Sequence, residues 1–204
     1  MKKIFLLIII LLTITGCAKY NDLNELAIIK SIGISHDKEY TLFAHVIEEI
    51  DKDNNPKMQL VKVNGKSISK LFSNIKLLVN KEIYLAHVDL LILDFNLDNN
   101  DYKELIHYFL KSKELRNDFL CIASDDIEKV LENSQYDEIE ELIETNKESK
   151  NIINITFEEI IKDFLDNQKF NISRVNYNEK IYFDGNYQFT NNKLERIKDE
   201  KVKN

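Results

Sequence analysis

The chain contains no tryptophan, one proline and four glycines among its 204 residues. Glycine and proline dominate flexible linkers and tight turns, so their scarcity predicts a chain without long linkers. Four glycines could hardly form a glycine-rich loop that binds phosphate, which argues against a nucleotide site of that kind. Histidine gives no sign of a metal site, because no His-x-x-x-His pair occurs among His36, His45, His87 and His107.

The sequence also lacks the patterns of common hydrolases. It has no Gly-x-Ser-x-Gly segment and no pairing of cysteine with histidine beyond chance. Acidic residues are abundant, but adjacent acids such as Asp125-Asp126 and Glu140-Glu141 are typical of solvated helix starts and helix faces. We therefore expect no catalytic residue, no metal ligand and no cofactor, and we predict that the protein is not an enzyme.

Only two cysteines occur, Cys17 and Cys121. Cys121 lies in the apolar run 119–123, where a cysteine is usually a buried small hydrophobic residue rather than a reactive thiol. If Cys17 is modified by lipid, Cys121 has no partner, and we then expect no disulfide.

No apolar run is long enough to span a bilayer. The longest run near the start, residues 4–12, falls short of the roughly 20 apolar residues that a membrane-spanning helix needs. It follows Lys2 and Lys3, and this order of positive charge and short apolar core is typical of a secretory signal. The start of the chain therefore predicts export.

The segment after the apolar core resembles the bacterial lipobox. Ile14-Thr15-Gly16-Cys17 has an aliphatic residue, two small residues and then the cysteine whose thiol would take the diacylglycerol. We predict a lipoprotein signal peptide at 1–16, lipidation of Cys17 and a lipidated tether at 17–25. The alternatives are a cleaved signal with an incidental cysteine, and an uncleaved signal that anchors the chain.

The formal charge of −7 bears on whether the protein binds polyanions directly. Removal of Lys2 and Lys3 with the signal would take this charge to about −9, which argues against nucleic acid and anionic lipid as partners. Attachment to a membrane would then depend on the lipid rather than on a basic patch. A hydrophobic content of 44% together with 31% charged residues predicts a folded body rather than disorder.

Residues 26–146 predict a sheet domain. Apolar and β-branched runs predict strands at 26–35, 40–47, 58–63, 83–85, 88–93 and 119–123. Apolar spacing predicts helices at 68–79 and 101–111, and acid-rich segments predict helices at 125–132, with acids in its first turn, and at 136–146. We expect Ser67 and Ser124 to cap two helices, the first two strands to form a hairpin, and the nearly all-apolar strand 88–93 to be central. The fold class is α+β, a mixed β-sheet flanked by helices.

Residues 147–204 predict a partial second α+β domain, a helix plus a β-hairpin, with a charged tail. A polar linker at 147–154 precedes the capping box Thr156-Phe157-Glu158-Glu159, which would open a helix that ends near residue 165. Strands are predicted at 170–175, 180–183 and 187–189, with turns at 184–186 and 191–192.

Several short segments resemble one family of lipoproteins. The best match follows Gly16-Cys17, where residues 23–29 and 33–35 precede Asp37 in the order that the family shows. Weaker matches are residues 65–69, 85–92, 115–119 with 122–123, and 185–189 with 193–194. On these segments the chain resembles the Ger(x)C family, the lipoprotein C subunits of spore germinant receptors.

The chain departs from the family pattern in three respects. Ala18 stands where tryptophan is usual after the lipid cysteine, and Ala86 stands where glycine commonly precedes the histidine. Members are also considerably longer, so the resemblance implies that this chain covers the first domain and the opening of the second, without the C-terminal domain.

The resemblance implies a lipid-anchored, non-catalytic subunit on the outer leaflet of the cell membrane or inner spore membrane. It would act by scaffolding or signal relay, with integral-membrane receptor subunits of the A and B types as partners. Two alternatives come from other classes of protein. One is a solute-binding lipoprotein of an uptake system, which a closed polar pocket would favour, and the other is a surface hydrolase, which histidines and acids in one cleft would favour.

Overall fold

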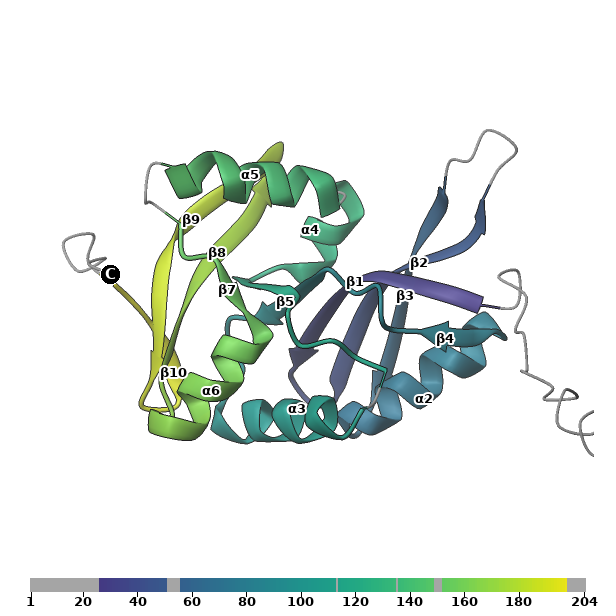
Figure 1. The fold of residues 1–204 in the computed structure, drawn as a ribbon, viewed down its shortest axis with the longest axis horizontal. Coiled ribbons are helices and arrows are strands. Elements are labelled where there is room, and N and C mark those ends of the chain that lie inside the picture. The colour runs from purple at the N-terminus through teal and green to yellow at the C-terminus, as the bar shows by residue number, and fades with distance from the viewer. Residues whose placement is uncertain (1–25, 51–55, 113, 135, 149–151, 198–204) are drawn as a thin grey trace, which may run out of the picture.

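The protein forms one mixed ten-stranded sheet with helices on both faces (Figure 1). The structure is a computed structural model that describes residues 26–50, 56–112, 114–134, 136–148 and 152–197. Its strands are β1 (Leu26–His36), β2 (Tyr40–Ile50), β3 (Pro56–Gly65), β4 (Glu82–Tyr84), β5 (Leu90–Asp94), β6 (Leu120–Ser124), β7 (Ile155–Thr156), β8 (Phe170–Asn178), β9 (Lys180–Thr190) and β10 (Lys193–Arg196). Its helices are α2 (Ile68–Val79), α3 (Asn99–Lys111), α4 (Ile127–Asn133), α5 (Tyr136–Glu148) and α6 (Phe157–Asn167). The predicted α+β class is confirmed.

The sheet is antiparallel at both edges and parallel in its centre. Its strands run in the order β10-β9-β8-β6-β5-β1-β2-β3, and β4 and β7 add to β1 and β6 respectively. The predicted hairpin of β1 and β2 is confirmed, with His36 opposite Tyr40 next to the turn. The predicted central strand is also confirmed, because β5 lies between β1 and β6 and is parallel to both.

Two cores fill the space on the two faces of the sheet. Leu91 and Leu93 of β5 face a core that includes α2, α3 and α6, while Leu90 and Ile92 face a core that includes α4 and α5. This alternation explains the unbroken apolar run, because successive side chains of a strand point to opposite faces and here both faces are covered. Figure 1 shows the same division, with α4 and α5 above the sheet and α2, α3 and α6 below it.

Side-chain hydrogen bonds cap the N-termini of two helices at the residues that the sequence predicts. Ser67 caps α2 by accepting a bond from the Lys70 backbone N–H at 3.3 Å, and Thr156 forms the predicted capping box with Glu159. The predicted cap of α4 is wrong: the side chain of Asp126 accepts from the Lys129 N–H, while Ser124 is buried at the end of β6. The polar side chain of Ser124 can be buried because its hydroxyl donates a hydrogen bond to Asn176 Oδ1 at 3.0 Å.

The predicted turn at 184–186 is also wrong, because β9 continues without a break from Lys180 to Thr190. Gly185 has a φ of +122°, and the register of β8 against β9 shifts opposite it, between Arg174 and Val175. A glycine in this conformation is typical of a bulge, which bends a strand without ending it. The predicted turn at 191–192 is confirmed: both asparagines have positive φ and join β9 to β10 as a two-residue hairpin loop.

The residues from 147 onward join the same sheet as those before them. Helix α5 extends to Glu148, and Ile152 is buried in the core that contains α5. Strand β7 pairs with β6, and β8 runs parallel to β6 with Arg174 opposite Ala123. The elements predicted as a partial second domain therefore add four strands to this sheet and one helix, α6, that packs against it.

Candidate functional site

Cys17, the one residue to which the sequence assigns a chemical role, lies outside the described residues. Its lipidation stays a prediction that rests on the segment 14–17. The described chain begins nine positions later, at Leu26, the first residue of β1. Functional features of the folded body must therefore be sought elsewhere.

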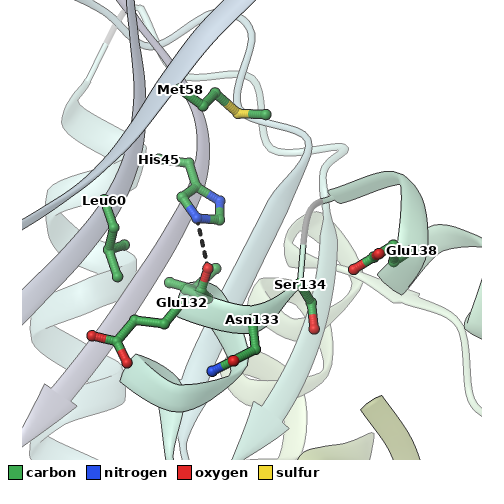
Figure 2. Close-up of a pocket in the computed structure, with 8 residues that line it drawn as sticks. His45, Met58, Leu60, Glu132, Asn133, Ser134 and Glu138 are labelled. Atoms are coloured by element: carbon green, nitrogen blue, oxygen red, sulfur yellow. Dashed lines mark hydrogen bonds between the residues drawn. The ribbon is translucent and has the colours of Figure 1, made fainter. Parts of the chain in front are cut away.

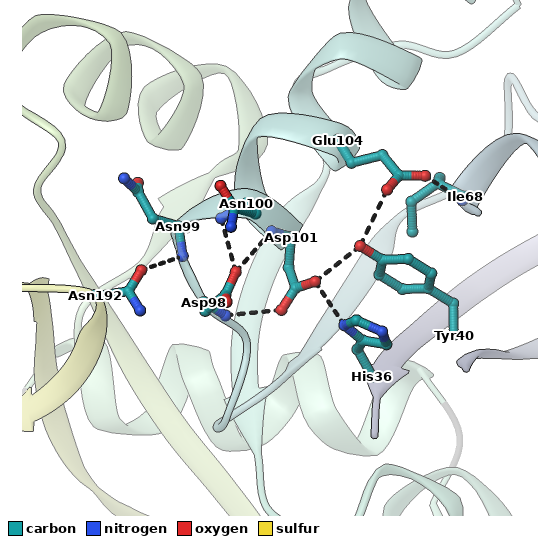
Figure 3. A network of polar contacts seen from close by, with 9 residues as sticks. All are labelled: His36, Tyr40, Ile68, Asp98, Asn99, Asn100, Asp101, Glu104 and Asn192. Atoms are coloured by element: carbon teal, nitrogen blue, oxygen red, sulfur yellow. Dashed lines mark hydrogen bonds and ion pairs between the residues drawn. The ribbon is translucent and has the colours of Figure 1, made fainter. Parts of the chain in front are cut away.

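The most connected polar group in the described residues surrounds Asp101, and we call it the Asp101 cluster (Figure 3). Asp101 Oδ1 accepts a hydrogen bond from the Tyr40 hydroxyl at 2.8 Å and lies 2.7 Å from His36 Nδ1. The Tyr40 hydroxyl also lies 3.1 Å from Glu104 Oε2, and the rings of His36 and Tyr40 stack with centroids 3.9 Å apart. The hairpin of β1 and β2 is thereby joined to α3.

The remaining carboxylate oxygens of the Asp101 cluster bind backbone groups. Asp101 Oδ2 accepts from the Asp98 N–H at 2.8 Å, and Glu104 Oε1 accepts from the Ile68 N–H at 2.7 Å. These N–H groups lie at the N-termini of α3 and α2, where backbone donors lack partners within the helix. Every oxygen of the two carboxylates thus has a donor from the protein itself, which suits the cluster to holding elements together.

Burial raises the pKa of Tyr40, and the hydrogen bond to Asp101 and the charges of Asp101 and Glu104 raise it further. The hydroxyl therefore remains a protonated donor at neutral pH and cannot act as a base. In the sequence His36 stands out only as one of four histidines without metal-site spacing, and Asp101 and Glu104 do not stand out. The capping-box spacing of Asp98 and Asp101 is the signal that could have revealed part of the cluster.

A second polar feature is a hollow of about 390 Å³ beside His45 of β2 (Figure 2). The His45 Nε2–H donates to the carbonyl oxygen of Leu131 in α4 at 2.8 Å. Among the described residues, neither His45 Nδ1 nor Ser134 Oγ has a hydrogen-bond partner. Burial lowers the pKa of His45, so the ring is neutral near pH 7 and ties β2 to α4 as a hydrogen-bond donor. The hollow is lined by His45, Met58, Leu60, Leu131, Glu132, Asn133, Ser134 and Glu138.

The lowered pKa of His45 predicts a loss of stability in acid. The unfolded histidine takes up a proton near pH 6.5, whereas the buried folded histidine does so only at lower pH. The unfolded state thus binds more protons below about pH 6.5, and the free energy of unfolding falls as the pH falls through this window. We expect urea unfolding to show a smaller loss between pH 7 and pH 5 in His45→Gln than in the wild type.

The control for this experiment is His107→Gln, because His107 is exposed on α3. It should retain the pH dependence of the wild type. Equal pH dependence in the wild type and in His45→Gln would show that His45 does not contribute.

A third polar feature centres on Arg174 of β8. Its guanidinium packs against the rings of both Phe95 and Tyr187, 4.6 Å from each centroid, and the two rings contact each other with centroids 5.0 Å apart. Its Nη1 lies 3.1 Å from Asp125 Oδ2, and its Nη2 pairs with Asp184. Two carboxylates therefore balance this charge, and one side chain links β8 to β9 and to the segments that follow β5 and β6.

The other predicted residues fall into structural roles. Burial raises the pKa of the Cys121 thiol well above its usual value, and the predicted buried, inert cysteine is confirmed. Asp125 pairs with Arg174, Asp126 caps α4, and His87 is exposed. No group of three histidine, cysteine, aspartate or glutamate residues within the described ranges is placed to hold a metal ion.

No helix in the described part of the chain combines the length and apolar character that crossing a bilayer requires. In the Asp101 cluster the Tyr40 hydroxyl lies beside two carboxylates, and its raised pKa keeps it protonated as a hydrogen-bond donor. The chemistry that these residues support is therefore contact and positioning.

Comparison with known families gives one match. The family model described as the spore germination protein N-terminal domain matches residues 19–176, which include β1 through most of β8. No curated protein and no solved structure matches the chain. The matched range continues past residue 146, in agreement with the single sheet.

Proposed function

Because this chain belongs to the Ger(x)C family of spore germination proteins, we propose that it is a lipid-anchored, non-catalytic C-type subunit of a nutrient-germinant receptor. It acts on the outer leaflet of the cell membrane or inner spore membrane. Its partners are the integral-membrane A- and B-type subunits, and its mechanism is scaffolding or signal relay through surface contact.

One observation carries this proposal: the family match begins at residue 19, two positions after the cysteine of the lipobox-like segment. A lipid on Cys17 would therefore hold the germination domain directly at the membrane surface. The acidic composition supports the same mechanism, because a chain of net charge −7 gains little from anionic lipid and needs another means of attachment.

The polar groups of the folded body support a role in contact rather than catalysis. The carboxylates of Asp101 and Glu104 are occupied by donors of the protein, and the thiol of Cys121 is buried. The hollow beside His45 brings one histidine near Glu132 and Glu138, but the hydrogen bond of His45 to the Leu131 carbonyl oxygen gives this histidine a structural role, which favours the receptor subunit over a solute-binding lipoprotein or a surface hydrolase.

Replacing Cys17 with alanine tests the anchor. We expect Cys17→Ala to abolish incorporation of labelled palmitate and to move the protein from the membrane fraction to the soluble fraction, because no other lipid acceptor is proposed. Cys121→Ala is the matched control, since it removes the other cysteine but should keep both the label and the membrane location. Equal labelling of the wild type and Cys17→Ala would refute lipidation.

The role in germination requires a separate measurement. Spores that lack the gene should respond more slowly to the nutrient that the receptor senses, and the wild-type gene should restore the response. Normal responses of the deletion strain to every nutrient tested would contradict the receptor function while leaving the lipidation result intact.

A further inference from the structure

Three exposed apolar side chains lie on α2 and β4, near the end of the folded body where β1 begins. Leu77 and Leu78, in the last turn of α2, are 76% and 60% exposed, and Tyr84 of β4 is 38% exposed. We call these three residues the α2–β4 patch. Two adjacent leucines with such high exposure are unusual on a surface that contacts only water. A group of exposed apolar side chains often marks a contact site.

The α2–β4 patch is next to the first described residue of the chain. Helix α2 ends at Val79, and β4 begins three residues later at Glu82. Leu26 then pairs with Glu82 and Ile28 pairs with Tyr84 in the parallel ladder of β1 and β4. Figure 1 shows the start of β1, β4 and the end of α2 together at one end of the molecule.

The distance between the lipid and this end is limited by the length of the chain. Nine peptide steps separate Cys17 from Leu26, which corresponds to at most about 30 Å when fully extended. A lipid on Cys17 lies in the bilayer, so Leu26 must remain within that distance of the membrane surface. The end that carries the α2–β4 patch can therefore reach the bilayer.

We propose that the α2–β4 patch rests on the lipid bilayer, with Leu77 and Leu78 entering the boundary between headgroups and acyl chains. This proposal rests on the proposed lipid attachment at Cys17. Leucine side chains suit that boundary, and lysine stems nearby can cover apolar surface while their ammonium groups reach the headgroups. Lys76 and Lys81 flank the patch, and Lys76 Nζ lies 4.0 Å from Glu82 Oε1.

The contact has a function that the lipid alone does not supply. One lipid-modified residue limits the distance between the body and the membrane but leaves the body free to rotate. A second, apolar contact fixes the rotation, so that the same surface always faces the neighbouring integral-membrane subunits. The acidic composition favours a neutral lipid surface, because apolar burial rather than charge provides the attraction.

The absence of tryptophan gives a clean test. The chain from residue 17 onward is coupled through the Cys17 thiol to a maleimide phospholipid, while Cys121 is protected by its burial. Single tryptophans are introduced as Leu78→Trp and, as matched control, Leu165→Trp. Leu165 is 64% exposed on α6, beside the β9–β10 turn at the other edge of the sheet. Fluorescence is compared in phosphatidylcholine vesicles with and without brominated acyl chains.

We expect brominated lipid to reduce the fluorescence of Leu78→Trp by about half and to leave that of Leu165→Trp nearly unchanged. Adding Leu77→Glu to the Leu78→Trp chain should restore most of the lost fluorescence, because a carboxylate opposes entry into the apolar region. Equal quenching at the two positions, or none at Leu78→Trp, would overturn the proposal.

A further outcome separates this proposal from a protein-binding role of the same patch. If Leu78→Trp is unquenched in lipid but shifts its emission when the integral-membrane subunits are present, the patch binds protein and the bilayer proposal is wrong. The coupling is chemical, so failure of natural lipidation, detected by the palmitate experiment, does not affect the result.

Discussion

Gly33→Ala is expected to lower the free energy of unfolding by about 3 kcal/mol, at the upper end of the usual cost of overpacking a core. A Cβ atom on Gly33 would lie 2.2 Å from Ile127 Cγ2, far inside van der Waals contact. It would also approach Leu131 Cδ1 at 3.3 Å, so α4 could not simply rotate away. Gly33 lies in the middle of β1, and its missing side chain allows α4 to pack against the sheet. Urea unfolding followed by circular dichroism measures the loss.

The cause of this loss can be isolated with a double-mutant cycle. Ile127→Ala removes the Cγ2 atom that the new methyl group would meet, so the double variant should be more stable than the sum of the two single effects by about 2 kcal/mol. Gly65→Ala is the control, because its Cβ would meet no atom closer than 3.2 Å, and it should cost less than about 1 kcal/mol. A Gly33→Ala protein as stable as the wild type would contradict the close approach of α4.

The elements that the sequence predicts well are those specified by neighbouring residues. The hairpin of β1 and β2, the cap of α2 at Ser67 and the loop at 191–192 each depend on a few consecutive side chains. Strand β9 shows the limit of such reasoning. Asp184-Gly185-Asn186 has the composition of a turn, but the same residues also suit a bulge, and only the pairing with β8 decides between the two.

The same distinction between local and long-range features applies to the candidate site. The lipobox-like segment at Cys17 can be identified because its chemistry depends on consecutive residues. The bond between His36 and Asp101 joins residues 65 positions apart, so it depends on how α3 packs against the hairpin. Likewise, no local pattern places the exposed Leu77 and Leu78 beside the start of β1. Their position follows from the parallel pairing of β1 with β4.

Arg174 joins β8 and β9 to the segments that follow β5 and β6. Arg174→Lys is expected to lower the free energy of unfolding by about 2 kcal/mol. The guanidinium contacts two rings and two carboxylates at once, and only 17% of the side chain is exposed. A lysine ammonium cannot pack against both Phe95 and Tyr187 while also bridging two acids, so at least one carboxylate loses its cationic partner. Urea unfolding gives the cost, and amide hydrogen exchange should show faster opening of β8 and β9 than of β5.

The same substitution at Arg116 separates the role of packing from that of charge. Arg116 pairs with Asp118, but its side chain is 64% exposed, so Arg116→Lys should leave the stability nearly unchanged. If Arg174→Lys is as mild as Arg116→Lys, the enclosed guanidinium does not hold β8 to β6. If Arg174→Lys accelerates exchange in β8 and β9 while β1, β2 and β5 remain protected, residues 170–196 open as a unit that Arg174 joins to the rest of the sheet. Such an opening would reconcile one continuous sheet with the division near residue 147 that the sequence predicts, because a unit can share a sheet and still unfold separately.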